Sequence, residues 1–125
     1  MRISVLSRST GLYSTSRLRL GGRAGGHRVE VIDPLELQLT MGVRGPKVRF
    51  AGRPIPRYDL FIPRIGASVT RYGVAVLRAL GERATVINGA DAIDRARDKI
   101  RALGSLANGR LRVPRTVTLR GGVGV

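Results

Sequence analysis

Short apolar runs alternate with amphipathic stretches along this 125-residue chain. Each apolar run ends at a turn signal, which is typical of buried strands, and the stretches between the runs have the length of helices. This alternation predicts an α/β fold with a mostly parallel sheet and flanking helices. The expected strands are residues 3–6, 27–32, 59–62 and 85–87, and the expected helices around them are residues 17–24 and 71–80.

Two further stretches alternate apolar with polar side chains, as half-exposed strands do. Residues 35–39 and 47–50 therefore predict a small β-hairpin beside the main sheet, and residues 51–54 predict a turn after it. A short helix is expected to end at Arg97, and Asp98 is expected to cap a second helix over residues 99–107.

After Pro114 the chain predicts one short strand over residues 116–119, followed by a glycine-rich tail. The tail suggests a phosphate-binding loop, but no helix follows it to supply the anion site that such a loop needs. We therefore interpret it as a frayed end.

Residues 59–73 carry the candidate site. Gly66 allows the backbone to turn after the strand, and Ser68 or Thr70 is expected to cap the next helix. Arg64 would then follow the carboxyl end of a strand, where open α/β sheets bind ligands. Its guanidinium could hold an acidic substrate through a bidentate carboxylate contact, or could simply stabilise the turn.

The charge is strongly positive, with 23 basic against 8 acidic residues and a formal net charge of +15. Such a balance points to nucleic acid, an anionic surface or an acidic protein partner, although a bias to arginine also follows from GC-rich base composition. Weak, salt-sensitive and nonspecific nucleic-acid binding is expected from charge alone. An evolved RNA module would need one continuous basic face formed by Arg2, Arg17, Arg19, Arg23, Arg28, Arg110, Arg112 and Arg115.

Several classes of site are absent from the sequence. The chain has no cysteine, so disulfides and thiolate metal sites are excluded. No apolar run approaches membrane-spanning length, and the first residues predict a strand, so we expect a cytoplasmic protein without a membrane partner. His27 is the single histidine and lacks a catalytic or metal-binding partner set. Asp91 and Asp94 are interpreted as helix-face ion-pair residues.

Four stretches together resemble the amino-terminal domain of the RimK-type ligases. These ligases are ATP-grasp enzymes that add glutamate to a small-subunit ribosomal protein. The stretches occur in the family's order and spacing, and they cover residues 1 to about 117 of this chain. They are residues 5–18, 26–35, 52–72 and 92–99.

The resemblance implies a Rossmann-like pre-ATP-grasp domain over residues 1–97 and the truncated start of an ATP-grasp domain over residues 98–125. It also implies ATP and magnesium for the intact family enzyme, none in this chain alone, and an acidic protein tail as acceptor. No catalytic residue is assigned. The substrate-binding candidates are Ser7, Arg8, Tyr13 and Arg64, and Lys99 is the candidate contact to ATP phosphate.

The sequence departs from the family in its first expected helix, which is interrupted by glycines and places Arg23 on its expected buried side. Replacing Gly21, Gly22 and Gly25 with alanine is therefore expected to stabilise the chain. The expected function is a ligase fragment that is inactive alone. The alternatives are a basic RNA- or ribosome-binding module and a non-catalytic partner of a separate ATP-grasp chain. The partner of the chain is then either another copy in an oligomer or that separate ATP-grasp chain.

Overall fold

A computed structural model describes residues 1–43, 45–66 and 69–119. The chain divides into two compact units, of which the first comprises residues 1–94 and the second begins at residue 95. No helix within the described residues has the length and apolar character needed to cross a membrane.

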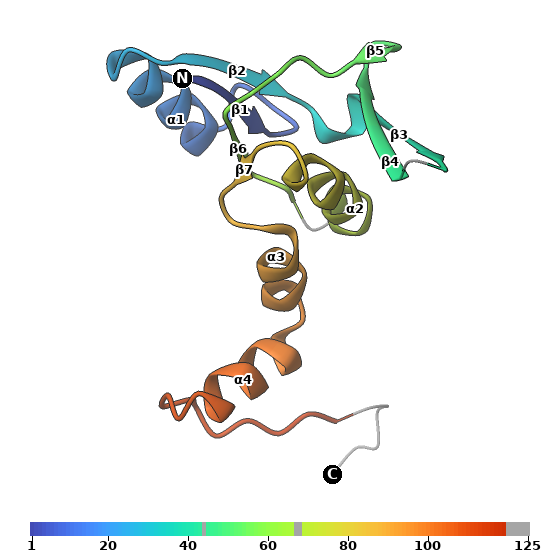
Figure 1. Cartoon of the computed structure of the whole chain (residues 1–125). Helices are drawn as coiled ribbons and strands as arrows, with labels where there is room; N and C mark the ends of the chain where they lie inside the picture. The colour runs from blue at the N-terminus through green and yellow to red at the C-terminus, as the bar shows by residue number, and fades with distance from the viewer. Residues whose placement is uncertain (44, 67–68, 120–125) are drawn as a thin grey trace. The chain divides into compact units, whose positions relative to one another are not determined.

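A four-stranded parallel sheet forms the centre of the first unit (Figure 1). Its order is β2-β1-β6-β7, and every neighbouring pair runs parallel. The predicted α/β fold with a mostly parallel sheet is confirmed. The strands are β1 (Arg2–Leu6), β2 (Arg28–Ile32), β6 (Leu60–Pro63) and β7 (Thr85–Val86).

Alternating side chains divide the core between the two faces of the sheet, as the pleat requires. On one face, Ile3, Val5 and Val29 pack with Leu18 of α1 (Tyr13–Ala24). The opposite face packs against α2 (Thr70–Gly81) through Leu6, Ile32, Phe61, Val76, Leu77 and Leu80. Both faces of β1 are therefore buried, and even the polar Ser4 is fully buried.

Helix α1 begins at Tyr13, four residues before its predicted start, and includes both Gly21 and Gly22. The prediction that Arg23 lies on the buried side is wrong, because Arg23 is exposed and its Nη2 donates to the Val29 carbonyl at 3.4 Å. Gly22 instead lies where the helix approaches β2, since a Cβ there would stand 2.6 Å from Val29 Cγ2. This glycine permits the packing of α1 rather than damaging it.

A second, antiparallel sheet of three strands follows β2 in sequence. The 3₁₀ turn η1 (Pro34–Glu36) leads into it, with Asp33 Oδ1 accepting from the Leu35 backbone N–H at 2.9 Å. The predicted hairpin is confirmed as β3 and β4. Residues 53–54, predicted as part of the turn that follows it, form a third strand. The strands are β3 (Leu37–Gly42), β4 (Gly45–Phe50) and β5 (Arg53–Pro54).

Helix α2 has Val69 as its N-cap residue, without a side-chain cap bond. The expected cap at Thr70 is wrong because Thr70 is already the first helical residue, and Ser68 lies outside the described residues. The Tyr72 hydroxyl donates to the Leu37 carbonyl at 2.6 Å, which fastens the start of α2 to β3.

Two helices follow the parallel sheet in sequence, α3 (Ala90–Arg97) and α4 (Lys99–Asn108). The predicted cap at Asp98 is confirmed: its Oδ1 accepts from the backbone N–H groups of Ile100 and Arg101, both at 3.0 Å. The predicted strand over residues 116–119 is wrong, because residues 111–119 have no regular secondary structure. The glycine-rich tail lies outside the described residues.

A polar network closes the amino-terminal edge of the parallel sheet. The Tyr58 hydroxyl donates to Glu30, and Arg2 Nη2 donates to both Glu30 carboxylate oxygens at 3.2 Å. The Arg2 guanidinium also lies 4.7 Å from the centre of the Tyr58 ring. Burial and the nearby Glu30 carboxylate raise the pKa of Tyr58 to about 12. The Tyr58 hydroxyl and the arginines lower the pKa of Glu30.

We predict opposite effects from two neighbouring glycine substitutions in α1. Gly21→Ala should raise the free energy of unfolding by about 0.5–1 kcal/mol, because no atom lies within 4 Å of the added methyl group and alanine favours the helix. Gly22→Ala should lower it by about 1–3 kcal/mol, because the buried, β-branched Val29 cannot yield freely. The close approach at Gly22 thus argues against the expectation that alanine stabilises all three sites.

Denaturant unfolding of both variants measures this difference. Val29→Ala serves as the control background, since it removes the methyl group that the new side chain would meet. The cost of Gly22→Ala should largely disappear there. An equal cost in both backgrounds would contradict the close approach.

We also predict a late-titrating tyrosine. Because the folded pKa of Tyr58 lies above its ordinary value, its stabilising effect is complete below about pH 10 and is lost as the pH rises toward 12. Ultraviolet difference titration of the folded chain should show one of the three tyrosines ionising near pH 12. Glu30→Gln should lower the pKa of Tyr58 toward the ordinary tyrosine value, because it removes a carboxylate that raises that pKa. Glu36→Gln, at an exposed position, should leave the pKa of Tyr58 unchanged. Simultaneous titration of all three would contradict the network.

Candidate functional site

Two loops leave the carboxyl edge of the parallel sheet side by side. Backbone hydrogen bonds continue past the strand ends: Ser7 N–H donates to the Ile32 carbonyl at 2.9 Å, and Arg64 N–H donates to the Leu6 carbonyl at 2.8 Å. The first residue after β1 is thus tied to β2, and the first residue after β6 is tied to β1. We call Ser7, Arg8, Tyr13, Ser14 and Arg64 the carboxyl-edge site.

Ser7 and Thr15 form a buried pair beneath this site. Ser7 is 1% exposed and Thr15 is fully buried, and their hydroxyl oxygens lie 2.8 Å apart. The Ser7 hydroxyl oxygen is also 3.2 Å from the Ser9 carbonyl oxygen, within hydrogen-bond distance. With its hydroxyl already bonded inside the protein, Ser7 orders the loop and holds it against α1.

Arg64 reaches from the β6 loop to the first turn of α1. Its Nη2 donates to the Ser14 hydroxyl at 3.0 Å, while the residue as a whole is exposed. A guanidinium has five N–H donors in a planar fork, so this contact leaves most of them available to a ligand. Since Ser14 is neutral, the contact positions Arg64 without cancelling its charge.

Arg8 and Tyr13 complete the edge. Arg8 Nε lies 3.8 Å from Asp33 Oδ2, at the end of β2, and the Arg8 side chain is half exposed. Tyr13 is the first residue of α1 and is 82% exposed. The four predicted substrate residues therefore lie on the same edge of the sheet. The side-chain partner of Arg64 is Ser14, which was not among the predicted residues.

The start of α1 adds a favourable field for anions. Its first turn contains no acidic residue, and its N-cap residue Leu12 makes no side-chain cap bond. Unpaired N–H groups at a helix start carry partial positive charge and bind anions. Together with Arg8 and Arg64, this helix end favours a carboxylate or phosphate ligand.

Sequence reasoning missed Ser14, Thr15 and Asp33 as parts of this edge. Ser14 and Thr15 lie in the first turn of α1, before the predicted helix start at residue 17, and the sequence does not show which hydroxyl turns inward. Asp33 precedes a proline, and its contacts with η1 and Arg8 depend on the folded edge.

Lys99 is the first residue of α4, in the second unit, and is exposed. Among the described residues, no group of three or more histidine, aspartate or glutamate side chains could hold a metal ion. We assign no step to a magnesium ion.

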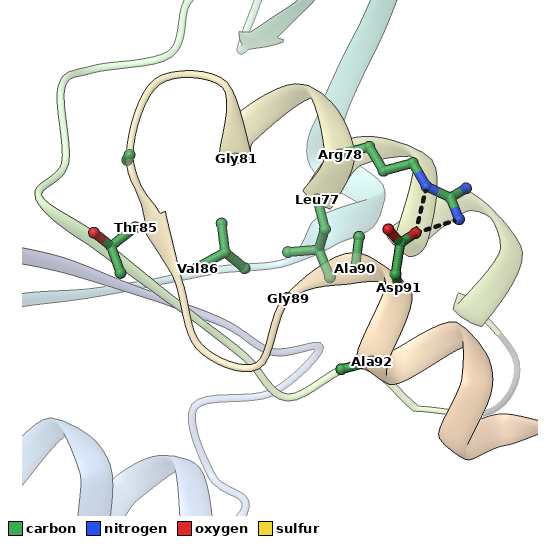
Figure 2. Close-up of a pocket in the computed structure, with 10 residues that line it drawn as sticks. Leu77, Arg78, Gly81, Thr85, Val86, Gly89, Ala90, Asp91 and Ala92 are labelled. Carbon is green, nitrogen blue, oxygen red and sulfur yellow. Dashed lines mark hydrogen bonds and ion pairs between the residues drawn. The ribbon is translucent and has the colours of Figure 1, made fainter. Parts of the chain in front are cut away.

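Another hollow lies along the edge strand β7, as Figure 2 shows, with a volume of about 670 Å³. Leu77 and Val86 are among its apolar lining residues. Its charged groups pair with each other, since Arg78 Nε and Nη2 donate to Asp91 Oδ1 at 3.2 and 2.9 Å. Asp91 does form an ion pair, but its partner is Arg78 of α2, so the expected pairing along its own helix face is wrong. Because these charges satisfy each other, the carboxyl-edge site remains the better anion-binding candidate.

Comparison with known sequences gives a consistent result. Residues 1–93 match the family model described as the RimK PreATP-grasp domain. A Vibrio vulnificus (strain YJ016) protein named probable alpha-L-glutamate ligase is 49% identical over 117 residues, which are 93% of this chain and 39% of that protein. A Xanthomonas campestris pv. campestris (strain 8004) protein of the same name is 48% identical over 118 residues, 94% of this chain and 40% of its own length. The chain thus spans about two fifths of these curated relatives.

Solved structures share the fold at lower sequence identity. The RimK domain protein ATP-grasp from Sphaerobacter thermophilus DSM 20745 is similar with a TM-score of 0.64 and 19% identity, over 92% of this chain and 40% of that one. The macrocyclase MdnB from Microcystis aeruginosa MRC is similar with a TM-score of 0.63 and 16% identity, over 97% of this chain and 54% of that one. These similarities support the fold alone.

Proposed function

Because the chain belongs to the RimK PreATP-grasp domain family, we propose that it is the amino-terminal part of an ATP-dependent glutamate ligase. In this proposal it forms one wall of the reaction cleft. The reaction class is the joining of an activated carboxylate to the amino group of glutamate. The observation that carries the proposal is the family match, which includes the whole carboxyl-edge site.

The chemistry of that edge suits an acidic substrate. Glutamate presents carboxylates, and arginine is the side chain best matched to carboxylate geometry. Arg64 is held by a neutral hydroxyl and extends into solvent, so we assign it the main substrate contact. Arg8 supplies a second charge, Tyr13 adds an exposed ring beside them, and Ser7 and Ser14 position the loop and Arg64.

We further propose an acidic protein tail, such as that of a ribosomal protein, as the acceptor. The net charge of +15 favours encounter with such a tail. We also propose that the protein acts in the cytoplasm and that Lys99 contacts ATP phosphate, as the resemblance implies. Each of these assignments follows from family membership and charge.

The distribution of arginines gives no support to a second proposal of RNA binding. Arg2 and Arg28 both pair with Glu30, whose strand neighbours Val29 and Val31 face α1. The side chains of Arg2 and Arg28 therefore belong to the face of the sheet opposite α1. Arg17 and Arg19, in contrast, lie on α1 itself. In the first unit, the basic residues of the predicted RNA face divide between two sides.

We predict that the 125-residue chain binds L-glutamate weakly at the carboxyl edge. Titration followed by ¹⁵N NMR should shift amides of residues 7–14 and 64–66. Arg64→Gln should weaken binding by about tenfold, because it removes a charge-assisted contact. Arg64→Lys should have an intermediate effect, since it keeps the charge without the planar fork. Arg17→Gln, an exposed position on α1, is the charge-matched control. Equal losses in Arg64→Gln and Arg17→Gln would contradict the assignment.

Activity can be tested in a chimaera with the Vibrio vulnificus relative, in which the 117 matched residues of this chain replace their counterparts. We expect glutamate-dependent ADP release, with a raised KM for glutamate on Arg64→Gln. The 125-residue chain assayed alone is expected to release no ADP. An inactive chimaera beside an active parent protein, or turnover by the chain alone, would contradict the proposed function.

A further inference from the structure

An apolar groove lies at the amino-terminal edge of the parallel sheet, opposite the carboxyl-edge site. It occupies about 400 Å³. Its walls come from the loop before β6, the loop before β7 and the end of α2. Its apolar lining includes Ile55, Phe61, Leu80 and Ala84, and its polar lining includes Arg57 and Arg83. We call it the amino-edge groove.

The floor of the amino-edge groove belongs to the hydrophobic core. Phe61 and Leu80 are each 2% exposed, and Ile55 and Ala84 pack against the same core cluster. Such a floor is pre-formed, so a ligand side chain would not have to order it.

The two arginines at the groove carry uncompensated charge. Arg57 and Arg83 are both exposed, and their guanidinium groups make no hydrogen bond or ion pair with the described residues. They come from different loops, so a ligand crossing the floor can meet both. Their charges distinguish this groove from the one along β7, where Arg78 is already paired.

Neighbouring acceptors do not neutralise these charges. Glu30, which accepts from Tyr58, is already paired with Arg2 and Arg28. The Leu80 carbonyl at the end of α2 accepts from the N–H groups of Arg83 and Ala84 at 3.0 and 3.1 Å. Exposed Glu82 is not among the residues that line the groove.

We propose that the amino-edge groove binds an acidic segment of a protein partner. One apolar side chain of the segment lies on the floor, and flanking carboxylates pair with Arg57 and Arg83. The inference rests on the groove alone and does not require the proposed ligase reaction, since no residue of the carboxyl-edge site lines it.

The composition of the groove favours peptide over nucleic acid. Nucleic-acid grooves of comparable charge use exposed aromatic faces on which bases stack. Here Tyr58 is 6% exposed, with its ring against Phe61 on one side and near the Arg2 guanidinium. The apolar side chains of the floor also offer no hydrogen bond to a base edge. Its volume lies near the lower end of the range for ligand pockets, about 300–1,000 Å³, and suits one or two peptide side chains.

The test uses the full 125-residue chain and a fluorescein-labelled peptide, Glu-Glu-Leu-Glu-Glu, at about 150 mM salt, where nonspecific surface attraction is screened. Fluorescence anisotropy should show saturable binding. The double variant Arg57→Gln/Arg83→Gln should weaken it by about tenfold or more. The control Arg17→Gln/Lys47→Gln removes two charges from exposed positions that do not line the groove, and should change affinity by less than about twofold.

Competition on the unmodified chain tests the same inference without any variant. Unlabelled Gln-Gln-Leu-Gln-Gln, without carboxylates, and Glu-Glu-Ser-Glu-Glu, without the apolar side chain, should each compete at least about tenfold less well than the parent peptide. Equal competition by either peptide, or equal losses in the two double variants, would overturn the inference. Random-sequence RNA that binds at this salt and loses affinity only in Arg57→Gln/Arg83→Gln would instead assign the groove to nucleic acid.

Discussion

Hydrogen bonds at the carboxyl end of β1 set the geometry on which the candidate site depends. The ladder does not stop with the strands, because Ser7 bonds to Ile32 and Arg64 bonds to Leu6 through their backbones. These bonds fix the directions in which both loops leave the sheet. The buried contact between Ser7 and Thr15 then joins the first loop to α1. A change at Ser7 or Thr15 would thus reach Arg64 through the helix that carries its partner, Ser14.

The parts of the fold that depend on local sequence were the predictable ones. Apolar runs of strand length located the parallel sheet, and Asp98 lies where a capping residue is needed. Arg64 could be placed because Pro63 and Gly66, on either side of it, mark the end of its strand. Parts that depend on contacts distant in sequence were not predictable. Gly22 looks like a helix-weakening residue until Val29 is brought beside it. Likewise, nothing local shows that Ser14, rather than Tyr13, meets Arg64.

The strong positive charge has a structural side as well as a functional one. Several of the eight acidic residues serve internal contacts: Glu30 and Asp33 pair with arginines, Asp91 pairs with Arg78, and Asp98 caps a helix. Arginines without such partners are left to interact with solvent or ligands. The net charge alone therefore identifies no site. A candidate binding site needs an arginine without an acidic partner beside a second binding feature. At the carboxyl edge Arg64 lies beside the start of α1, and at the amino edge Arg57 and Arg83 lie beside an apolar floor.

Arg8 and Arg64 lie at the same edge of the sheet but differ in whether an acidic side chain offsets their charge. Arg8 lies 3.8 Å from the Asp33 carboxylate, which offsets part of its field. Arg64 is held at 3.0 Å by a hydroxyl, so its position is restrained while its charge remains whole. An incoming carboxylate would have to compete with Asp33 at Arg8, but it can add to the contact that Arg64 already makes. Restraint by a neutral partner gives Arg64 both preorganisation and full charge, and for this reason the proposed function assigns it the main substrate contact.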